Sequence, residues 1–350
     1  MTFELPRPPD EAAEAPAALI RDILGHYGLR LIGEALPVAN SVLNPNFRAE
    51  TDDGPRFVRL FRTAKERDLA EAEHRLIAWV GDRDIPVCRP FATGSGETVV
   101  SVEGRLAAVF PWLEHRALSR GEVTVAEAAV LGGLQGRIQA LLAEYRDPVL
   151  EARPRSEVEW DTERSIADLS RVDDVIRYYP APSADRLEAQ DALRQQLDLL
   201  EAGAAHPCTD FAALPEQVDH CDFHERNVLF GHGLDVLAVV DWERARVNPR
   251  AFHLLRALDF IGLTESRPHI EAYATAHGRY VRLSPGECEA AVEQWWQSVL
   301  HNSWAFTEVF IRGNEAARPF LSQIGPRLHR LSVPSSRQWL ARALIASATG

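Results

Sequence analysis

The chain has 350 residues and a formal charge of −13 at neutral pH, and its length predicts a large core arranged in two lobes or domains. The acidic balance argues against a nucleic-acid partner, because phosphate binding needs basic stripes. No apolar run approaches the ~20 residues that span a membrane, and the N-terminus is acidic and proline-rich rather than signal-like. We therefore expect a cytoplasmic protein without a membrane partner.

The first 110 residues alternate between helical and strand-like patterns. Apolar residues at helical spacing predict two helices, over residues 17–24 and 67–79. Runs of β-forming residues predict strands within 36–51, at 57–61, at 98–102 and at 106–110, with a turn at 52–55. We expect these strands to form a small antiparallel sheet.

The rest of the chain is mostly helical in pattern. Long apolar-periodic stretches predict helices over 126–145, 185–200 and 249–260, two or three helices in all within 148–215, and a mainly helical remainder from 268. One exception stands out. The runs Val228–Phe230 and Val236–Val240 flank a turn with Gly231 and Gly233, which predicts a β-hairpin.

Polar side chains gather at one end of this hairpin. Asp222, His224 and Asn227 precede its first strand, and Asp241 follows its second. Antiparallel pairing places the entrance of one strand beside the exit of the other, so we expect these groups to lie together. Two carboxylates and an amide oxygen suit a hard cation such as Mg²⁺. Their order and spacing also fit the kinase template of a catalytic Asp, a metal-binding Asn five residues later and a second metal-binding Asp.

The amino-acid sequence around these residues extends the match. The segment H-C-D-F-H-E-R-N-V-L-F at 220–230 resembles the H-G-D-x-H-x-x-N-[VI]-L signature of the aminoglycoside phosphotransferase family, which also holds choline kinases and related homoserine kinases. V-V-D-W-E at 239–243 resembles the metal-binding I-D-[WF]-[ED] segment of that family. The second His of the first motif separates the group from protein kinases, whose loop reads H-R-D-x-x-x-x-N.

The resemblance implies an α+β, protein-kinase-like fold of two lobes. A nucleotide-binding lobe with a small antiparallel sheet would span residues 1–110, and a larger helical lobe for catalysis and acceptor binding would span 111–350. The implied reaction is ATP- and Mg²⁺-dependent phosphorylation of a small-molecule hydroxyl. Asp222 would orient and deprotonate that hydroxyl, and Asn227 and Asp241 would hold Mg²⁺. The residues implied as loop or substrate support are His220, His224 and Glu243.

The same resemblance implies a nucleotide site in the first lobe. F-V-R-L-F-R at 57–62 is similar to the family strand whose Lys or Arg reaches the phosphates, which assigns that role to Arg59. Glu73 would hold Arg59, with Glu71 as a rival. Residues 40–50 would form the nucleotide-covering turn and the strand after it, and Asn46 matches the Asn of the family segment at this place. Adenine would bond backbone groups between Ala108 and Trp112, and the segment with Phe110 and P-W-L-E-H at 111–115 would connect the lobes.

Several positions depart from the family pattern. Cys221 replaces the usual Gly of H-G-D, and a loop adjustment is expected because Gly tolerates backbone angles that Cys does not. No glycine lies between Gly33 and Gly54, where phosphates would be cradled. Gln139 stands where the family has His, and His253 stands where it has a structural Asp; we expect His253 to be a core residue.

Lysine and cysteine usage narrows the chemistry further. Lys65 is the only lysine, and Glu66 follows it with no glycine loop before it, which excludes a Walker A phosphate loop. Arginine or Lys65 must therefore fill any role that usually needs lysine. The four cysteines predict neither a disulfide framework nor a cysteine-rich zinc site, because none forms a CxxC pair; they are Cys88, Cys208, Cys221 and Cys288.

Three other functions fit parts of the sequence. A nucleotide-binding regulator of the pseudokinase type would keep the fold without turnover. A Ser/Thr protein kinase would share the catalytic motif, although A-P-E and D-F-G segments are absent from the sequence. A zinc hydrolase would use the neighbouring residues His220, Cys221, Asp222 and His224.

The acceptor is not named by the sequence. An amino sugar, an aminoalcohol, an amino acid or a natural product each fits, and the negative net charge would suit a cationic one. The choice of ATP over GTP and the oligomeric state stay open as well.

Overall fold

The computed structural model describes residues 17–38, 45–61, 66–155, 157–178, 184–203 and 209–348. Two of the sequence predictions therefore fall outside the described residues, at least in part. They are most of the nucleotide-covering turn, residues 40–44, and any role for Lys65.

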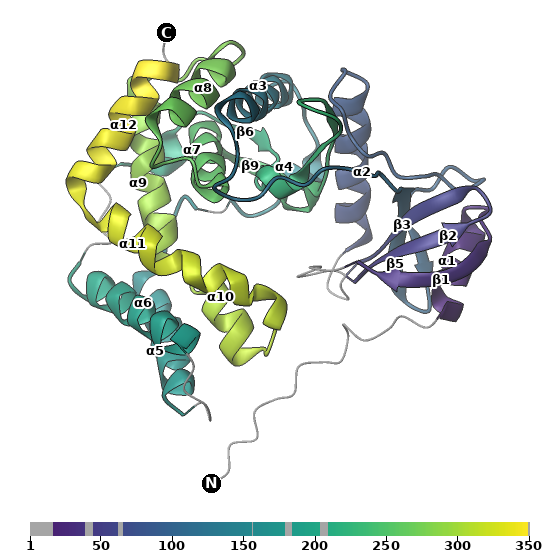
Figure 1. Ribbon diagram of the computed structural model, residues 1–350, viewed down its shortest axis with the longest axis horizontal. Coiled ribbons are helices and arrows are strands. Elements are labelled where there is room, and N and C mark those ends of the chain that lie inside the picture. The colour runs from purple at the N-terminus through teal and green to yellow at the C-terminus, as the bar shows by residue number, and fades with distance from the viewer. Residues whose placement is uncertain are drawn as a thin grey trace.

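The first lobe is a five-stranded antiparallel sheet in the order β1-β2-β3-β5-β4. One helix packs on each face, and the second of them lies between the sheet and the helical lobe (Figure 1). The elements are α1 (Ala17–His26), β1 (Leu31–Pro37), β2 (Asn46–Thr51), β3 (Gly54–Leu60), α2 (Arg67–Gly81), β4 (Val100–Val102) and β5 (Arg105–Pro111).

The alternation of side chains along β3 separates these two faces. Val58 and Leu60 are buried in the cluster formed with α1. Phe57 and Phe61 belong to the cluster on the α2 face, so Arg59, which lies between them, also points toward α2. Arg59 is thereby directed at the junction of the two lobes.

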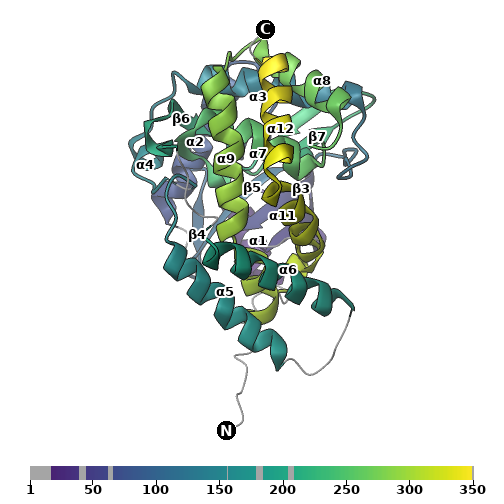
Figure 2. The same cartoon turned by 90° about the vertical axis from the view of Figure 1, so that its left-hand side faces the viewer.

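The second lobe is mainly helical (Figure 2). Its helices are α3 (Val125–Leu142), α4 (Pro148–Glu151), α5 (Thr162–Arg177), α6 (Ala184–Glu201), α7 (Arg250–Ile261), α8 (Arg267–Gly278), α9 (Pro285–His301), α10 (Trp304–Phe306), α11 (Ile324–Ser332) and α12 (Pro334–Ala348). Short 3₁₀ or π segments complete it, at η2 (Phe211–Ala213), η3 (Glu225–Asn227), η4 (Trp242–Arg244), η5 (Thr307–Ile311) and η6 (Glu315–Gln323). None of the described helices is both long and apolar enough to cross a membrane.

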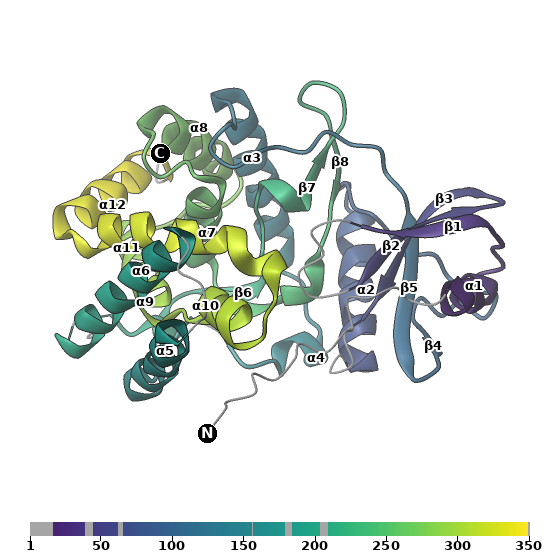
Figure 3. The ribbon, with the colours of Figure 1, turned by 60° about the horizontal axis from the view of Figure 1, so that its bottom comes forward.

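Two small antiparallel pairs carry the motif residues. β6 (Glu216–Asp219) pairs with β9 (Arg246–Pro249), and β7 (Val228–Phe230) pairs with β8 (Val236–Val239). The β7–β8 hairpin is held from both sides, because Val239 donates its N–H to the carbonyl of Pro86 at 2.8 Å and Arg116 donates to Phe230 at 2.7 Å. It therefore lies where the chain passes from one lobe to the other (Figure 3).

Most predicted elements are confirmed, including the sheet, the helix predicted at 67–79, the hairpin and the helix predicted at 185–200. Two features were missed. The first strand begins at Leu31, five residues before the predicted region, and the β6–β9 pair was not predicted. Each strand of that pair has only four residues, too short for a clear alternation pattern.

Glycines allow α3 and α8 to approach closely. A Cβ atom on Gly132 would lie 2.1 Å from the carbonyl oxygen of Tyr273, which is far inside van der Waals contact. The neighbouring Gly133 is different, because its nearest contact would be the Cβ of Ala276 at 3.8 Å. Only the first of these two glycines is thus required by packing.

We expect Gly132→Ala to lower the free energy of unfolding by about 3 kcal/mol or more, because α3 and α8 must separate. Gly133→Ala is the matched control, and it should raise that free energy by up to about 1 kcal/mol through helix propensity. Urea unfolding of both variants measures the difference. Equal stability of the two would contradict the packing argument.

Candidate active site

The hairpin brings the four predicted groups to one place. Val240 donates its backbone N–H to the carbonyl of Asn227 at 2.9 Å, which extends the β7–β8 pairing toward the loop. Asn227 comes just before β7 and Asp241 comes just after β8, so the two residues lie side by side at the same end of the hairpin. Asp222 lies in the loop before η3, and its carbonyl accepts from Nδ2 of Asn227 at 2.9 Å.

Asp222 is held by a residue that the sequence prediction missed. Nη2 of Arg256, on α7, donates to Oδ1 of Asp222 at 2.6 Å. Burial alone would raise the pKa of Asp222, but the charges of Arg256, His224 and Arg244 lower it by more, so it lies well below its usual range. Asp222 is thus ionised at neutral pH. Arg256 is 6% exposed in an apolar helix segment, and a lone arginine in that setting was the available signal.

His224 packs beside this ion pair rather than within it. Its ring stacks on Phe260 with centroids 6.0 Å apart, and Nε2 lies 3.2 Å from Nδ2 of Asn227. Burial lowers the pKa of His224 to about 4, although Asp222 opposes the shift. The ring is therefore neutral at pH 7 and contacts the two groups on either side of it.

His220 joins the two ends of the site. Nδ1 accepts from the backbone N–H of Asp222 at 3.2 Å, and Nε2 donates to the carbonyl of Val240 at 3.0 Å. One ring nitrogen accepts a hydrogen bond and the other donates one, and only the neutral ring can do both. Burial lowers the pKa of His220 to about 4 and so favours that form. His220 supports the loop and does not face solvent, since it is 1% exposed.

Cys221 keeps the backbone conformation that glycine would take. Its φ is 61°, in the left-handed region, where a residue with a Cβ atom is strained. The expected adjustment of the loop is therefore wrong. The buried thiol donates to the carbonyl of Arg246 at 3.6 Å and lies 3.9 Å from Nδ2 of Asn248. These contacts hold a strained residue directly before Asp222.

Asp241 is the second left-handed residue of the site, with φ of 62°. Its Oδ1 accepts from Nη2 of Arg59 at 3.3 Å, and 40% of its side-chain surface is exposed. Burial raises the pKa of Asp241 to about 6, and the neighbouring carboxylates of Asp222 and Glu243 add to the effect, whereas Arg59 opposes it. Burial is thus the main cause of the raised pKa, and the nearby carboxylates act against Arg59.

Arg59 connects three elements. Nη1 contacts Oε1 of Glu73 at 3.1 Å, while Nη2 contacts Asp241. Glu73 is 2% exposed, and Glu71, its rival, pairs instead with Arg67. Asn46 stands directly opposite Arg59 in the β2–β3 register and so shares its face of the sheet.

Ala108 and Phe110 lie on the same face of the sheet as Arg59. They pair with Arg59 and Phe57 across β3, and the guanidinium of Arg59 lies 5.9 Å from the ring centroid of Phe110. The carbonyl of Val109 accepts from Phe91 on the opposite side of the strand, so the backbone groups of Ala108 and Phe110 face β3. Their side chains, rather than their backbone groups, lie on the face of the sheet that carries Arg59.

Two further residues named in the sequence analysis, His253 and Glu243, are both buried. His253 is buried and its Nε2 lies 3.2 Å from Nδ2 of Asn248, so the expected core role is confirmed. Glu243 is 7% exposed, and its backbone carbonyl accepts from Nη1 of Arg153 at 2.8 Å. Its carboxylate is close enough to raise the pKa of Arg59.

The zinc alternative does not fit this arrangement. Within the described residues, no three His, Cys, Asp or Glu side chains converge as a metal site. His220 is directed at Val240, Cys221 at Arg246 and Asp222 at Arg256, so the neighbouring ligands diverge.

The Asn227–Asp241 pair fits a hard divalent cation better. The amide NH₂ of Asn227 donates to Asp222, which leaves Oδ1 as a donor oxygen. In the described part of the chain, Oδ2 of Asp241 has no hydrogen bond, while Oδ1 contacts Arg59. An amide oxygen and a partly exposed carboxylate suit Mg²⁺, which keeps further positions for phosphate and water.

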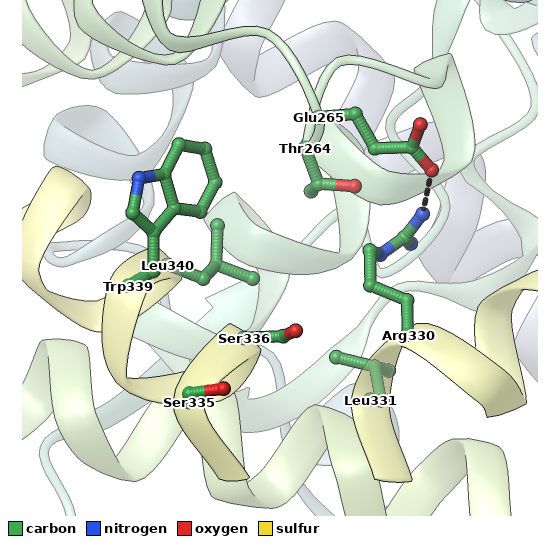
Figure 4. A pocket seen from close by; sticks show the side chains of 8 residues that line it. All are labelled: Thr264, Glu265, Arg330, Leu331, Ser335, Ser336, Trp339 and Leu340. Atoms are coloured by element: carbon green, nitrogen blue, oxygen red, sulfur yellow. Dashed lines mark hydrogen bonds and ion pairs between the residues drawn. The ribbon is translucent and has the colours of Figure 1, made fainter. Parts of the chain in front are cut away.

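Two hollows of the described surface lie away from these residues. One is lined by residues of α11, α12 and the segment after α7 (Figure 4). Its Arg330 is paired with Glu265 and Asp259, so no excess charge faces the hollow. The other lies between α3 and α8. Neither contains a predicted site residue.

Comparisons with known proteins identify the family of the chain. A model of the phosphotransferase enzyme family matches residues 34–290. A homoserine kinase of Caulobacter sp. (strain K31) is 28% identical over 276 residues, which cover 76% of this chain and 78% of the relative.

Solved structures are similar over nearly the whole chain. An amicoumacin kinase in complex with AMP-PNP and Ca²⁺ has a TM-score of 0.62 at 12% identity, covering 94% of each chain. A spectinomycin phosphotransferase in complex with ADP and spectinomycin also has a TM-score of 0.62 at 12% identity, covering 94% of this chain and 98% of the other. At these identities the likeness shows the protein-kinase-like fold. The match of the family model goes further: this chain belongs to the phosphotransferase enzyme family and is a kinase of small-molecule hydroxyl groups.

Proposed function

We propose that this chain transfers the γ-phosphoryl group of ATP, with Mg²⁺, to a hydroxyl of a small molecule in the cytoplasm. The observation that carries the proposal is the meeting of Asp222, Asn227 and Asp241 beside Arg59. The first three groups come from the helical lobe, and Arg59 comes from the sheet. Such a junction is where a nucleotide and an acceptor would approach each other.

The chain would hold the nucleotide from the sheet side. Arg59, fixed by Glu73, presents a guanidinium that suits phosphate oxygens. Asn46 lies beside it, and the side chains of Ala108 and Phe110 continue the same face toward the position proposed for adenine. Backbone groups near Trp112, the last residue of the predicted range and just beyond the end of β5, would contact the base. Asn227 and Asp241 would hold Mg²⁺, which neutralises charge on the transferring phosphoryl.

Asp222 would act on the acceptor. Because its pKa is low, Asp222 stays ionised and accepts a hydrogen bond from the acceptor hydroxyl, which fixes the direction of attack. The hydroxyl oxygen bonds to the γ-phosphorus, the bond to the bridging β–γ oxygen breaks, and ADP leaves. The hydroxyl proton passes to Asp222. A weak base suits a loose transition state, in which little proton transfer is needed before the phosphoryl moves.

The proposed acceptor class includes several kinds of compound. A panel of candidate acceptors would contain homoserine, because of the homoserine kinase from Caulobacter, together with aminoalcohols and amino sugars. A pseudokinase-type regulator would bind the nucleotide without phosphorylating anything. Calorimetry combined with turnover therefore separates the two functions.

We expect Mg²⁺-dependent ATP binding that Asp241→Asn weakens by more than about tenfold, because a carboxylate ligand of the cation is lost. Asp235→Asn is the control, since this aspartate is exposed on the same hairpin. Isothermal titration calorimetry with and without EDTA measures both. Equal binding by wild type and Asp241→Asn, or none by the wild type, would overturn the proposal.

Asp222→Asn should lower kcat by about 10²- to 10⁴-fold and leave the KM for ATP nearly unchanged, because the hydroxyl loses its orienting base. Steady-state kinetics with any acceptor from the panel measures this. An unchanged kcat would remove Asp222 from the chemistry.

Arg256→Gln should lower kcat by roughly 10- to 100-fold, because Asp222 loses the partner that fixes its carboxylate. The exposed Arg226, in the same loop, provides the control variant Arg226→Gln, which should keep the wild-type kcat. If the two variants behaved alike, Arg256 would have no positioning role.

A further inference from the structure

The partly buried ring of Phe260, near the end of α7, lies beside the residue that holds Asp222. Arg256 precedes Phe260 by four residues, so the two side chains share one face of the helix. The guanidinium of Arg256 lies 4.2 Å from the centroid of the Phe260 ring, and its Nη2 donates to Oδ1 of Asp222. One aromatic side chain is therefore in contact with the partner of the proposed base.

The hydrogen bond to Asp222 does not by itself fix the guanidinium of Arg256. Among the described residues, Asp222 is the one hydrogen-bond partner of this guanidinium, although the group carries several N–H donors. A planar group held at one nitrogen can still turn about that contact. Stacking on an aromatic face restricts the rotation, and arginine stacks well on such faces. The ring of Phe260 therefore supplies the second contact that sets the plane of the guanidinium.

The ring of Phe260 is itself held by the loop that contains Asp222. The imidazole of His224 stacks on it with an angle of 23° between the two planes. Nε2 of His224 lies 3.2 Å from Nδ2 of Asn227, which donates to the carbonyl of Asp222. The loop and the ring therefore cannot move independently of each other.

Residues of α9 and α11 also hold this ring. The guanidinium of Arg327 lies 5.1 Å from the centroid of Phe260 and 5.5 Å from that of Trp295. The Trp295 ring meets Phe260 edge-on, with centroids 5.8 Å apart. Asp259, the residue before Phe260, is buried and pairs with both Arg327 and Arg330. These ion pairs fix the end of α7 to α11, and so they fix the backbone that carries the ring.

Phe252, on the same helix, shows what an aromatic residue of the core alone contacts. It is fully buried, and its ring neighbours are His253 and Trp295. Phe260 is only partly buried, and one of its neighbours, Arg256, binds Asp222. Packing of the core therefore accounts for Phe252 but leaves the contacts of Phe260 unexplained.

We propose that Phe260 is a positioning residue for phosphoryl transfer: its ring orients the guanidinium of Arg256 and thereby directs the carboxylate of Asp222 at the acceptor hydroxyl. The inference rests on the proposed function, in which Asp222 orients that hydroxyl, and adds the residue that orients the partner of Asp222. A small displacement of the carboxylate misdirects the hydroxyl but leaves the nucleotide in place. Loss of the ring should therefore lower kcat without changing the KM for ATP.

Phe260→Leu removes the aromatic face and keeps an apolar side chain. We expect it to lower kcat by roughly 5- to 30-fold and to change the KM for ATP by less than about twofold. Phe260→Tyr keeps the ring and should stay within about threefold of the wild-type kcat. The matched control is Phe252→Leu, which should lower the melting temperature more than Phe260→Leu does and keep the wild-type kcat. Steady-state kinetics would use L-homoserine, ethanolamine or glucosamine, whichever the wild type phosphorylates fastest.

Two further measurements test the route through Arg256. In a double-mutant cycle, adding Phe260→Leu to Arg256→Gln should lower kcat by less than about twofold, because no guanidinium is left to orient. NMR of the arginine Nε–Hε groups needs no turnover, and the Arg256 signal is identified by its absence in Arg256→Gln. Phe260→Leu should remove the ring-current shift of this signal and increase its mobility, whereas Phe260→Tyr should keep both.

Each other outcome has a definite meaning. A wild-type kcat for Phe260→Leu overturns the inference, and so does an equal loss of kcat in the wild-type and Arg256→Gln backgrounds. A loss of kcat in Phe252→Leu as large as that in Phe260→Leu reduces the role of the ring to packing and overturns it as well. If the wild type phosphorylates none of the probes, the proposed function fails, and an unchanged Arg256 signal in Phe260→Leu separately overturns the role of Phe260.

Discussion

The arrangement of the site depends on one buried imidazole. His220 accepts from the backbone of Asp222 and donates to the carbonyl of Val240, so a single neutral ring sets the distance between the loop with Asp222 and the strand that ends at Asp241. Charging the ring would remove the acceptor and place a cation in the core. The low pKa that burial gives His220 is therefore a condition for the geometry, and not a sign of proton transfer.

A second constraint couples the lobes. Arg59 belongs to the sheet, Glu73 to the helix behind it and Asp241 to the helical lobe, and all three meet through the guanidinium of Arg59. The carboxylates must both approach one buried cation, because that cation would be costly to bury alone. Opening the lobes would separate Arg59 from Asp241 but not from Glu73, which lies in the same lobe. The position of Asp241 is thus linked to the way the two lobes pack against each other.

The sequence was sufficient for the hairpin, the small sheet and the family, since those depend on local periodicity and on a motif of fixed spacing. It was not sufficient for the partners of the motif. Arg256 lies 34 residues after Asp222, and only the packing of α7 against the loop brings them together. Cys221 was misjudged for a related reason: the sequence reveals the strain of a left-handed residue but not the contacts that hold it.

Two aspartates of this site differ because of their surroundings. Arg256 lowers the pKa of Asp222, whereas burial and neighbouring carboxylates raise that of Asp241 to about 6. Oppositely shifted groups of one type mark a division of roles. Asp222 already has its cation and is free to accept a hydrogen bond from a hydroxyl. Asp241 shares Arg59 with Glu73, and burial disfavours its charged form, an effect that a bound divalent cation would offset. Burial and local charge, rather than residue type, would thus separate the proposed base from the proposed metal ligand.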